Sequence, residues 1–128
     1  MAILKIVDSK QLALVLAEID QPVYIQLRTP AEPEPDLLEA LADLQRLCPL
    51  IKLDQQSEAA LEADQVTIKG EADRGLHFQG PPLGTELAAL VSACVVVGRR
   101  DSGLSPAIRQ GLASLTEPVQ LEVFTTPT

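Results

Sequence analysis

Three prolines within six residues, Pro30, Pro33 and Pro35, divide the first half of the chain into an extended run and a helix. Proline lacks a backbone N–H and fixes φ, so this segment continues neither a helix nor an inner strand. Residues 23–27 before it are a β-rich run of the length of a buried central strand. After it, leucines at helical spacing indicate a helix that ends before Pro49. These leucines are Leu37, Leu38, Leu41, Leu44 and Leu47.

Two start points fit this helix: Glu34 as the cap with Pro35 in the first turn, or Asp36 as the cap. An earlier helix is predicted to begin at Asp8, with Gln11 placed to complete a capping box. Its apolar face comprises Leu12, Val15, Leu16 and Ile19.

The middle of the chain predicts three more strands. Residues 50–54 alternate apolar and polar side chains, and the acidic residues 55–64 predict a solvated turn or a short helix. Residues 66–69 and 76–79 are expected to form two strands joined by a turn over residues 70–75.

The C-terminal third predicts two helices and a strand. A helix begins at Gly84 or Thr85 and is expected to end at Gly98. Because this helix, residues 85–97, is apolar nearly all round, we expect it to be covered on more than one side, in part by another subunit or domain. A last helix begins at Ser105, with Ile108, Leu112 and Leu115 on one face. Residues 119–124 are predicted to form a terminal strand.

The order of these elements predicts an α/β fold of thioredoxin-like type. It consists of a central mixed four-stranded sheet flanked by helices, with an extra N-terminal helix and a C-terminal strand. Residues 1–117 are expected to form this domain, and residues 118–128 the C-terminal strand.

Composition limits the function classes. A chain of 128 residues with 46% hydrophobic content can bury one core. Its 18 acidic and 10 basic residues, the lack of Trp and the absence of any basic cluster beyond Arg99-Arg100 argue against a nucleic-acid partner. No signal peptide or membrane-spanning run is recognised, which predicts a cytoplasmic protein without a membrane partner.

The two cysteines, Cys48 and Cys94, do not form a Cys-x-x-Cys pair. Cys48 lies at the C-terminal end of a predicted helix, whereas the helix dipole favours a thiolate at the N-terminus. Cys94 lies in an apolar helix. Both are interpreted as small buried hydrophobes, and a disulfide between them stays open at this point.

The run from His77 to Leu87 resembles the Phe-x-Gly-x-Pro-x-Gly-His-Glu-Phe segment of one family. This family comprises the N-terminal domain of the large flavoprotein subunit of alkyl hydroperoxide reductase and the two-lobed protein disulfide oxidoreductases. Pro22-Val23 resembles its entry into the first lobe, and residues 121–128 resemble its entry into the second lobe, directly before that lobe's dithiol.

The resemblance implies two thioredoxin-fold lobes, of which the second carries the working dithiol that relays electrons from the flavin portion. The first lobe keeps its dithiol in the oxidoreductases and loses it in the flavoproteins. In this sequence the first-lobe dithiol would fall within residues 28–36, where proline and glutamate stand instead. The family's cis-proline before the third strand is replaced by Ala63-Asp64. The resemblance therefore implies the inactive type of lobe.

For the other candidate residues, a structural role explains the sequence better than a functional one. His77 is the only histidine and has no second metal ligand or base patterned nearby. The carboxylates of Glu32, Glu34 and Asp36 lack a calcium-loop pattern. Gly80 and Gly84 lack a phosphate-loop motif and are interpreted as backbone hinges. Asp101-Ser102 does not form a triad with His77. The sequence thus predicts no catalytic, cofactor-binding or metal-ligating residue, and no cofactor.

The main functional hypothesis is a redox-inactive thioredoxin-fold domain with a structural or docking role, not an enzyme by itself. A protein partner or a second lobe is expected, with a homodimer through the 119–124 strand or helix 85–97 as a further option. The alternative is a thiol-disulfide or peroxide-related enzyme that acts through Cys48 or Cys94 alone.

Overall fold

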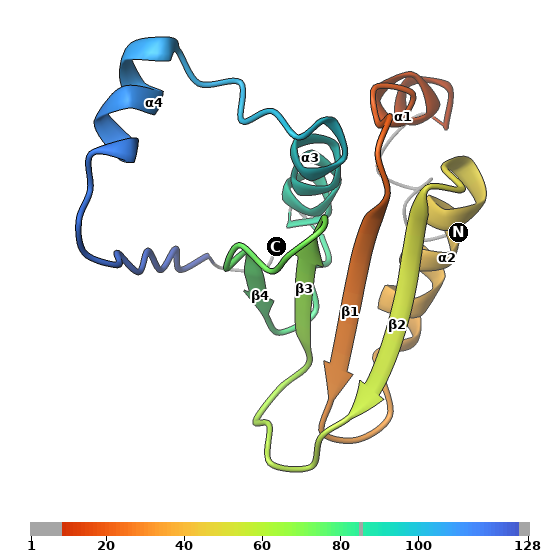
Figure 1. Ribbon diagram of the computed structural model, residues 1–128. Coiled ribbons are helices and arrows are strands. Elements are labelled where there is room, and N and C mark those ends of the chain that lie inside the picture. The colour runs from red at the N-terminus through yellow and green to blue at the C-terminus, as the bar shows by residue number, and fades with distance from the viewer. Residues whose placement is uncertain (1–8, 85, 126–128) are drawn as a thin grey trace.

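The computed structural model describes residues 9–84 and 86–125 (Figure 1). The eight helices and strands of the described residues follow one another in the order that the sequence predicts. In chain order they are α1 Ser9–Leu16, β1 Val23–Thr29, α2 Pro35–Leu47, β2 Ile51–Ser57, β3 Gln65–Lys69, β4 His77–Gln79, α3 Glu86–Arg99 and α4 Pro106–Ala113.

The four strands form one mixed sheet in the order β2-β1-β3-β4. β2 runs parallel to β1, with Val23 opposite Ile51, and the α2 crossover joins them. β3 is antiparallel to β1, and β4 is antiparallel to β3. The predicted mixed four-stranded sheet is therefore confirmed.

One face of the sheet carries the core. Val23, Ile25 and Leu27 alternate along β1 and are at most 1% exposed. α2 and α3 both cover this face, and α1 packs against α3 (Figure 1). Their buried residues join the strands in a single apolar cluster, which includes Leu12, Leu16, Leu37, Leu41, Leu44, Leu87, Leu90 and Cys94.

The α2 start follows the first of the two sequence interpretations. Glu34 is the N-cap and Pro35 lies in the first turn, so Asp36 is inside the helix. The cap that the sequence predicts for α1, Asp8, lies outside the described residues. Ile19, which the sequence assigns to the apolar face of this helix, follows the end of α1 and is 5% exposed. Val15 is 40% exposed, so it does not belong to the buried face of this helix.

The segment after residue 54 differs from the prediction of a turn or short helix. β2 continues to Ser57, because Thr29 still pairs with Ser57 and the N–H of Glu58 donates to the carbonyl of Thr29 at 2.8 Å. Residues 58–64 then reach β3 without a helix. The register with β1, which a single strand does not reveal, overrides the local polar pattern.

α3 does not end at Gly98 as predicted; it continues to Arg99. Gly98 is buried, and a Cβ on it would lie 2.6 Å from Cγ2 of Ile19. Its carbonyl accepts the backbone N–H groups of Asp20 and Gln21 at 3.3 and 3.0 Å. The glycine therefore permits close helix packing, and Arg100, with φ of 56°, makes the left-handed turn instead.

In the part of the chain that the structure describes, α3 is covered on one side, and its expected cover by another subunit or domain stays a prediction. Leu87, Leu90, Val91, Cys94 and Val95 are buried, whereas Ala88, Ala89, Ser92 and Val96 are exposed. Thr85, one of the two predicted start residues, lies outside the described residues.

Residues 101–125, which we call the C-terminal arm, stand away from the body (Figure 1). Helix α4 forms as predicted, and its cap Ser105 accepts the N–H of Ile108 through Oγ at 3.3 Å. The predicted strand over residues 119–124 is not formed: in the described part of the chain no residue after Gln79 belongs to a strand. The segment pairs with neither edge strand of the sheet, β2 or β4.

No helix in residues 9–84 or 86–125 is long and apolar enough to cross a membrane.

Candidate functional site

The first candidate site is the N-terminus of α2, where a buried central strand delivers the chain to a helix start. This is where a thiolate gains most from the helix dipole. Thr29, 3% exposed, ends β1 and donates from Oγ1 to the carbonyl of Ala31 at 2.8 Å. Glu34 caps the helix with extended backbone and makes no side-chain cap bond. The positions expected for a dithiol thus lie in the right place but carry prolines and carboxylates.

Asp64 faces this helix start from the residue before β3. Its Oδ2 accepts the backbone N–H of Glu34 at 3.4 Å, and its carbonyl accepts the N–H of Gly80 at 2.7 Å. No cis peptide bond occurs in the described ranges. A carboxylate therefore occupies the side of the site where the resemblance leads us to look for a cis-proline.

The cysteines lie far from this position. Cys48 caps the opposite end of α2, roughly 20 Å along a 13-residue helix, and is 6% exposed. Cys94 is fully buried in α3; burial first, and then the neighbouring Cys48, raise its pKa to about 12. Both thiols are free. A buried thiol with so high a pKa is a poor nucleophile at neutral pH.

The remaining sequence candidates have local structural partners. Nδ1 of His77 lies 2.7 Å from Oγ1 of Thr67, and its Nε2 lies 3.7 Å from Asp73. Gly80 and Gly84 have φ of 81° and 63°, which only their conformational freedom makes easy.

Asp101 lies in the connection to α4, where it accepts the N–H of Gly103 at 2.9 Å and pairs with Arg109. The Gly103 N–H and, next, the Arg109 guanidinium lower the pKa of its carboxyl. The described residues hold no group of three His, Cys, Asp or Glu side chains placed to bind a metal.

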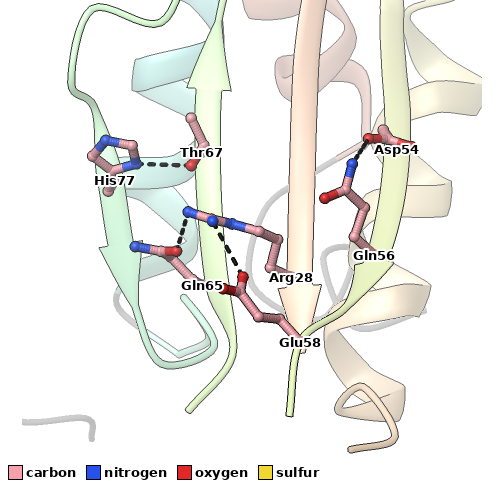
Figure 2. Close-up of polar contacts among 7 residues, drawn as sticks. All are labelled: Arg28, Asp54, Gln56, Glu58, Gln65, Thr67 and His77. Carbon is pink, nitrogen blue, oxygen red and sulfur yellow. Dashed lines mark hydrogen bonds and ion pairs between the residues drawn. The ribbon is translucent and has the colours of Figure 1, made fainter. Parts of the chain in front are cut away.

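Sequence reasoning missed a second candidate, the open face of the sheet. Alternate residues of each strand point away from the helices and form a polar surface (Figure 2). The residues of this face are Tyr24, Gln26, Arg28, Lys52, Asp54, Gln56, Gln65, Thr67, Lys69, His77 and Gln79. The signal was present in the alternation of polar residues with Val23, Ile25 and Leu27.

Arg28 organises one end of this open face. Its Nη1 lies 3.2 Å from Oε2 of Glu58, and Nη2 donates to Oε1 of Gln65 (Figure 2). At the other end a shallow hollow of about 290 Å³ opens between β2, β1 and β3. It is lined by Tyr24, Ile25, Gln26, Lys52, Leu53, Asp54 and Lys69.

No protein-family model matches the sequence, and neither does any curated protein. Solved structures do match. A protein disulfide oxidoreductase from Aeropyrum pernix K1 is 24% identical with a TM-score of 0.67, over 83% of this chain and 53% of the other. A mutant of the alkylhydroperoxide reductase AhpF from Enterococcus faecalis is 22% identical with a TM-score of 0.70, over 83% and 58%. The NTD_N/C domain of the same reductase is 21% identical with a TM-score of 0.72, over 84% and 59%.

The fold is thioredoxin-like. Sheet order β2-β1-β3-β4 with the α2 crossover, together with these matches, confirms the predicted fold class and its likeness to the N-terminal domain of AhpF. At identities of 24% or less the likeness concerns the fold. The thioredoxin-like chain spans a little more than half the length of each matched structure.

Proposed function

We propose that this chain is a redox-inactive thioredoxin-fold lobe with a structural or docking role, and not an enzyme by itself. The observation that carries the proposal is the α2 N-terminus. Glu34 and Asp64 meet there, while both thiols are buried elsewhere. A dithiol enzyme needs an accessible thiolate at such a helix start and a resolving thiol within reach.

The docking role is supported by the C-terminal arm. Its large apolar side chains are exposed: Leu104, Ile108, Leu112, Leu115, Val119, Leu121, Val123 and Phe124, at 40% to 88%. Monomeric proteins rarely leave so many such groups in contact with water, so the arm is a surface that a partner covers. Thr125 donates to the carboxylate of Glu86, which returns the arm to the start of α3.

The end of the arm is prepared for strand pairing. The side chain of Gln120 donates to Oε1 of Glu122 at 2.9 Å, so these two residues share a side of the backbone. Val119, Leu121 and Val123 alternate with them in the sequence and are 64% to 87% exposed. An extended segment with apolar alternate residues and free backbone groups readily joins a sheet edge.

A second thioredoxin-type lobe is the partner we favour for the arm, because the matched structures are nearly twice as long as the part that this chain spans. Residues 119–124 would then provide that lobe's first strand. A homodimer through the same segment, or through the exposed Ala88, Ser92 and Val96 side of α3, is the second candidate. A cytoplasmic location suits the two free thiols, since reducing compartments keep cysteines unpaired.

The arm can be tested by placing a charge on its apolar face. Leu112→Glu on the apolar face of α4 should abolish binding to a separately produced second thioredoxin-type lobe. Leu121→Glu, within residues 119–124, should do the same, and should return a homodimer through this segment to monomer mass in analytical ultracentrifugation. Gln110→Glu adds the same charge to an exposed α4 residue outside the apolar set and should change neither. The docking role would be contradicted by a parent chain that stays monomeric, does not bind such a lobe, and has the same mass and binding as Leu112→Glu.

A further inference from the structure

The open face of the sheet, on the body of the lobe and away from the arm, has no cover from the described part of this chain. α2 and α3 both lie on the opposite face, and residues 58–64 between β2 and β3 contain no helix (Figure 1). Parallel strand pairs such as β1 and β2 are usually covered on both faces. The uncovered side of β1 is therefore a place where another molecule can be expected.

A row of three side chains crosses this face near the start of β1. Tyr24 is paired with Lys52 on β2 and with Lys69 on β3, so the two lysines flank the tyrosine on the same face. Two strand spacings separate the lysine backbones by roughly 9.6 Å. Tyr24, between them, is 42% exposed and borders the hollow of about 290 Å³.

The charges of this row are not neutralised. Within the described residues, the side-chain ammonium groups of Lys52 and Lys69 have no hydrogen-bond or ion-pair partner. By contrast, four arginines are paired with carboxylates: Arg28 with Glu58, Arg46 with Asp43, Arg99 with Glu18 and Arg109 with Asp101. In a chain of net charge −8, two free ammonium groups beside an exposed tyrosine form a distinct surface. Charge complementarity selects an acidic ligand.

The next row of the face supplies groups that fit a peptide backbone. Gln26 offers an amide, and the carboxylate of Asp54 accepts from Gln56 Nε2 at 3.1 Å and has lone pairs to spare. Both residues line the hollow next to Tyr24. A tyrosine flanked by polar groups is the composition that binding surfaces favour.

We propose that the row Lys52–Tyr24–Lys69 binds an acidic peptide segment in polyproline II conformation. This conformation repeats every three residues with a rise of about 3.1 Å per residue, so two carboxylates three residues apart lie on the same side of the peptide and span about 9 Å, close to the separation of the two lysines. Each carboxylate pairs with one ammonium group, and the residues between them pack over the Tyr24 ring.

The test uses a fluorescein-labelled hexapeptide with two glutamates three positions apart, Gly-Glu-Ala-Ala-Glu-Gly, in an anisotropy titration of the full chain. Lys52→Gln and Lys69→Gln should each weaken saturable binding at least fivefold, and higher salt should weaken it further. Arg74→Gln removes the same charge from the exposed 70–76 turn and should leave affinity within twofold. Circular dichroism melts establish that each variant stays folded.

Four results would overturn the proposal. They are no saturable binding, equal binding of the matched peptide with two glutamines, equal weakening by Arg74→Gln, or equally tight binding of inorganic sulfate, which would mark a small-anion site. Because the arm is intact in all these variants, the result is independent of the Leu112→Glu experiment. Failure of one proposal is thus distinguishable from failure of the other.

Discussion

Oδ2 of Asp64 lies 3.4 Å from the backbone N of Glu34, so the residue before β3 reaches across to the start of α2. A carboxylate there interacts favourably with the positive end of the helix. A redox-active fold would use this electrostatic advantage for a thiolate, whereas this chain uses it for an aspartate. The start of α2 thus combines a helix N-terminus with a neighbouring carboxylate.

Replacing the carboxylate of Asp64 should lower the free energy of unfolding slightly. Asp64→Asn keeps the size of the side chain but removes its charge, and should lower the free energy of unfolding by about 0.5 kcal/mol. Urea denaturation at low salt measures the difference. Glu62→Gln, an exposed residue without a helix terminus beside it, is the matched control. Equal effects of the two substitutions would show that Asp64 contributes only net charge.

Because of Cys94, the free energy of unfolding is expected to depend on pH in the alkaline range. Its pKa rises from 9.0 to about 12 on folding, chiefly because it is buried, so the folded state favours the neutral thiol. This contribution is complete below pH 9 and is lost as pH rises through 12, because the unfolded chain ionises first. The stability difference between the parent and Cys94→Ala should therefore shrink between pH 9 and 11 in denaturant titrations. A constant difference would show that the thiol ionises equally in both states.

Gly98 and Ile19 should be energetically coupled. Gly98→Ala gains about 1 kcal/mol in helix propensity, but forcing a Cβ against Ile19 costs about 1–3 kcal/mol, so we expect net destabilisation. In an Ile19→Ala background the same change should be stabilising. Gly111→Ala, which meets open space in α4, is a control that should not destabilise. Additive effects in the double-mutant cycle would contradict this packing.

In the connection from α3 to α4, the carboxyl of Asp101 should titrate at an unusually low pH. The N–H of Gly103 and the guanidinium of Arg109 lower the pKa of Asp101 below its ordinary 3.8. These two contacts therefore stabilise the connection at pH values above the ordinary pKa of 3.8. The stabilisation is lost as pH falls through the lower pKa that Asp101 has in the folded chain. An NMR titration of the carboxyl should show Arg109→Gln moving its midpoint upward, part of the way only, since Gly103 remains. An unshifted midpoint would show that the ion pair does not influence this carboxyl.

Local signals predicted most of the fold because they act over a few residues. Prolines 30, 33 and 35 bound α2, and turn residues 70–75 separate β3 from β4. The order of the elements predicted the thioredoxin-like arrangement, and the resemblance around His77 to Leu87 agreed with it. What failed depends on neighbours distant in sequence: the pattern around Gly98 predicts a helix end, because the contact of this glycine with Ile19 is not visible in a linear sequence.

The predicted terminal strand also depends on contacts with residues distant in sequence. Residues 119–124 have the composition of a strand, but a strand exists only with a paired edge, and these residues pair with neither edge strand of the sheet, β2 or β4. The open face of the sheet was also missed. Its polar residues are ordinary singly, and only the register of Tyr24 with Lys52 and Lys69 brings them into one row.

The most direct test of the central claim is the reduction of insulin disulfides by the purified chain with dithiothreitol as the electron source. Because Glu34 and Asp64 occupy the α2 N-terminus and both thiols are buried, we predict precipitation of the insulin B chain at the rate of dithiothreitol alone. A matched amount of an active thioredoxin serves as the positive control. Acceleration comparable with that control, lost on Cys48→Ala or Cys94→Ala, would contradict the account.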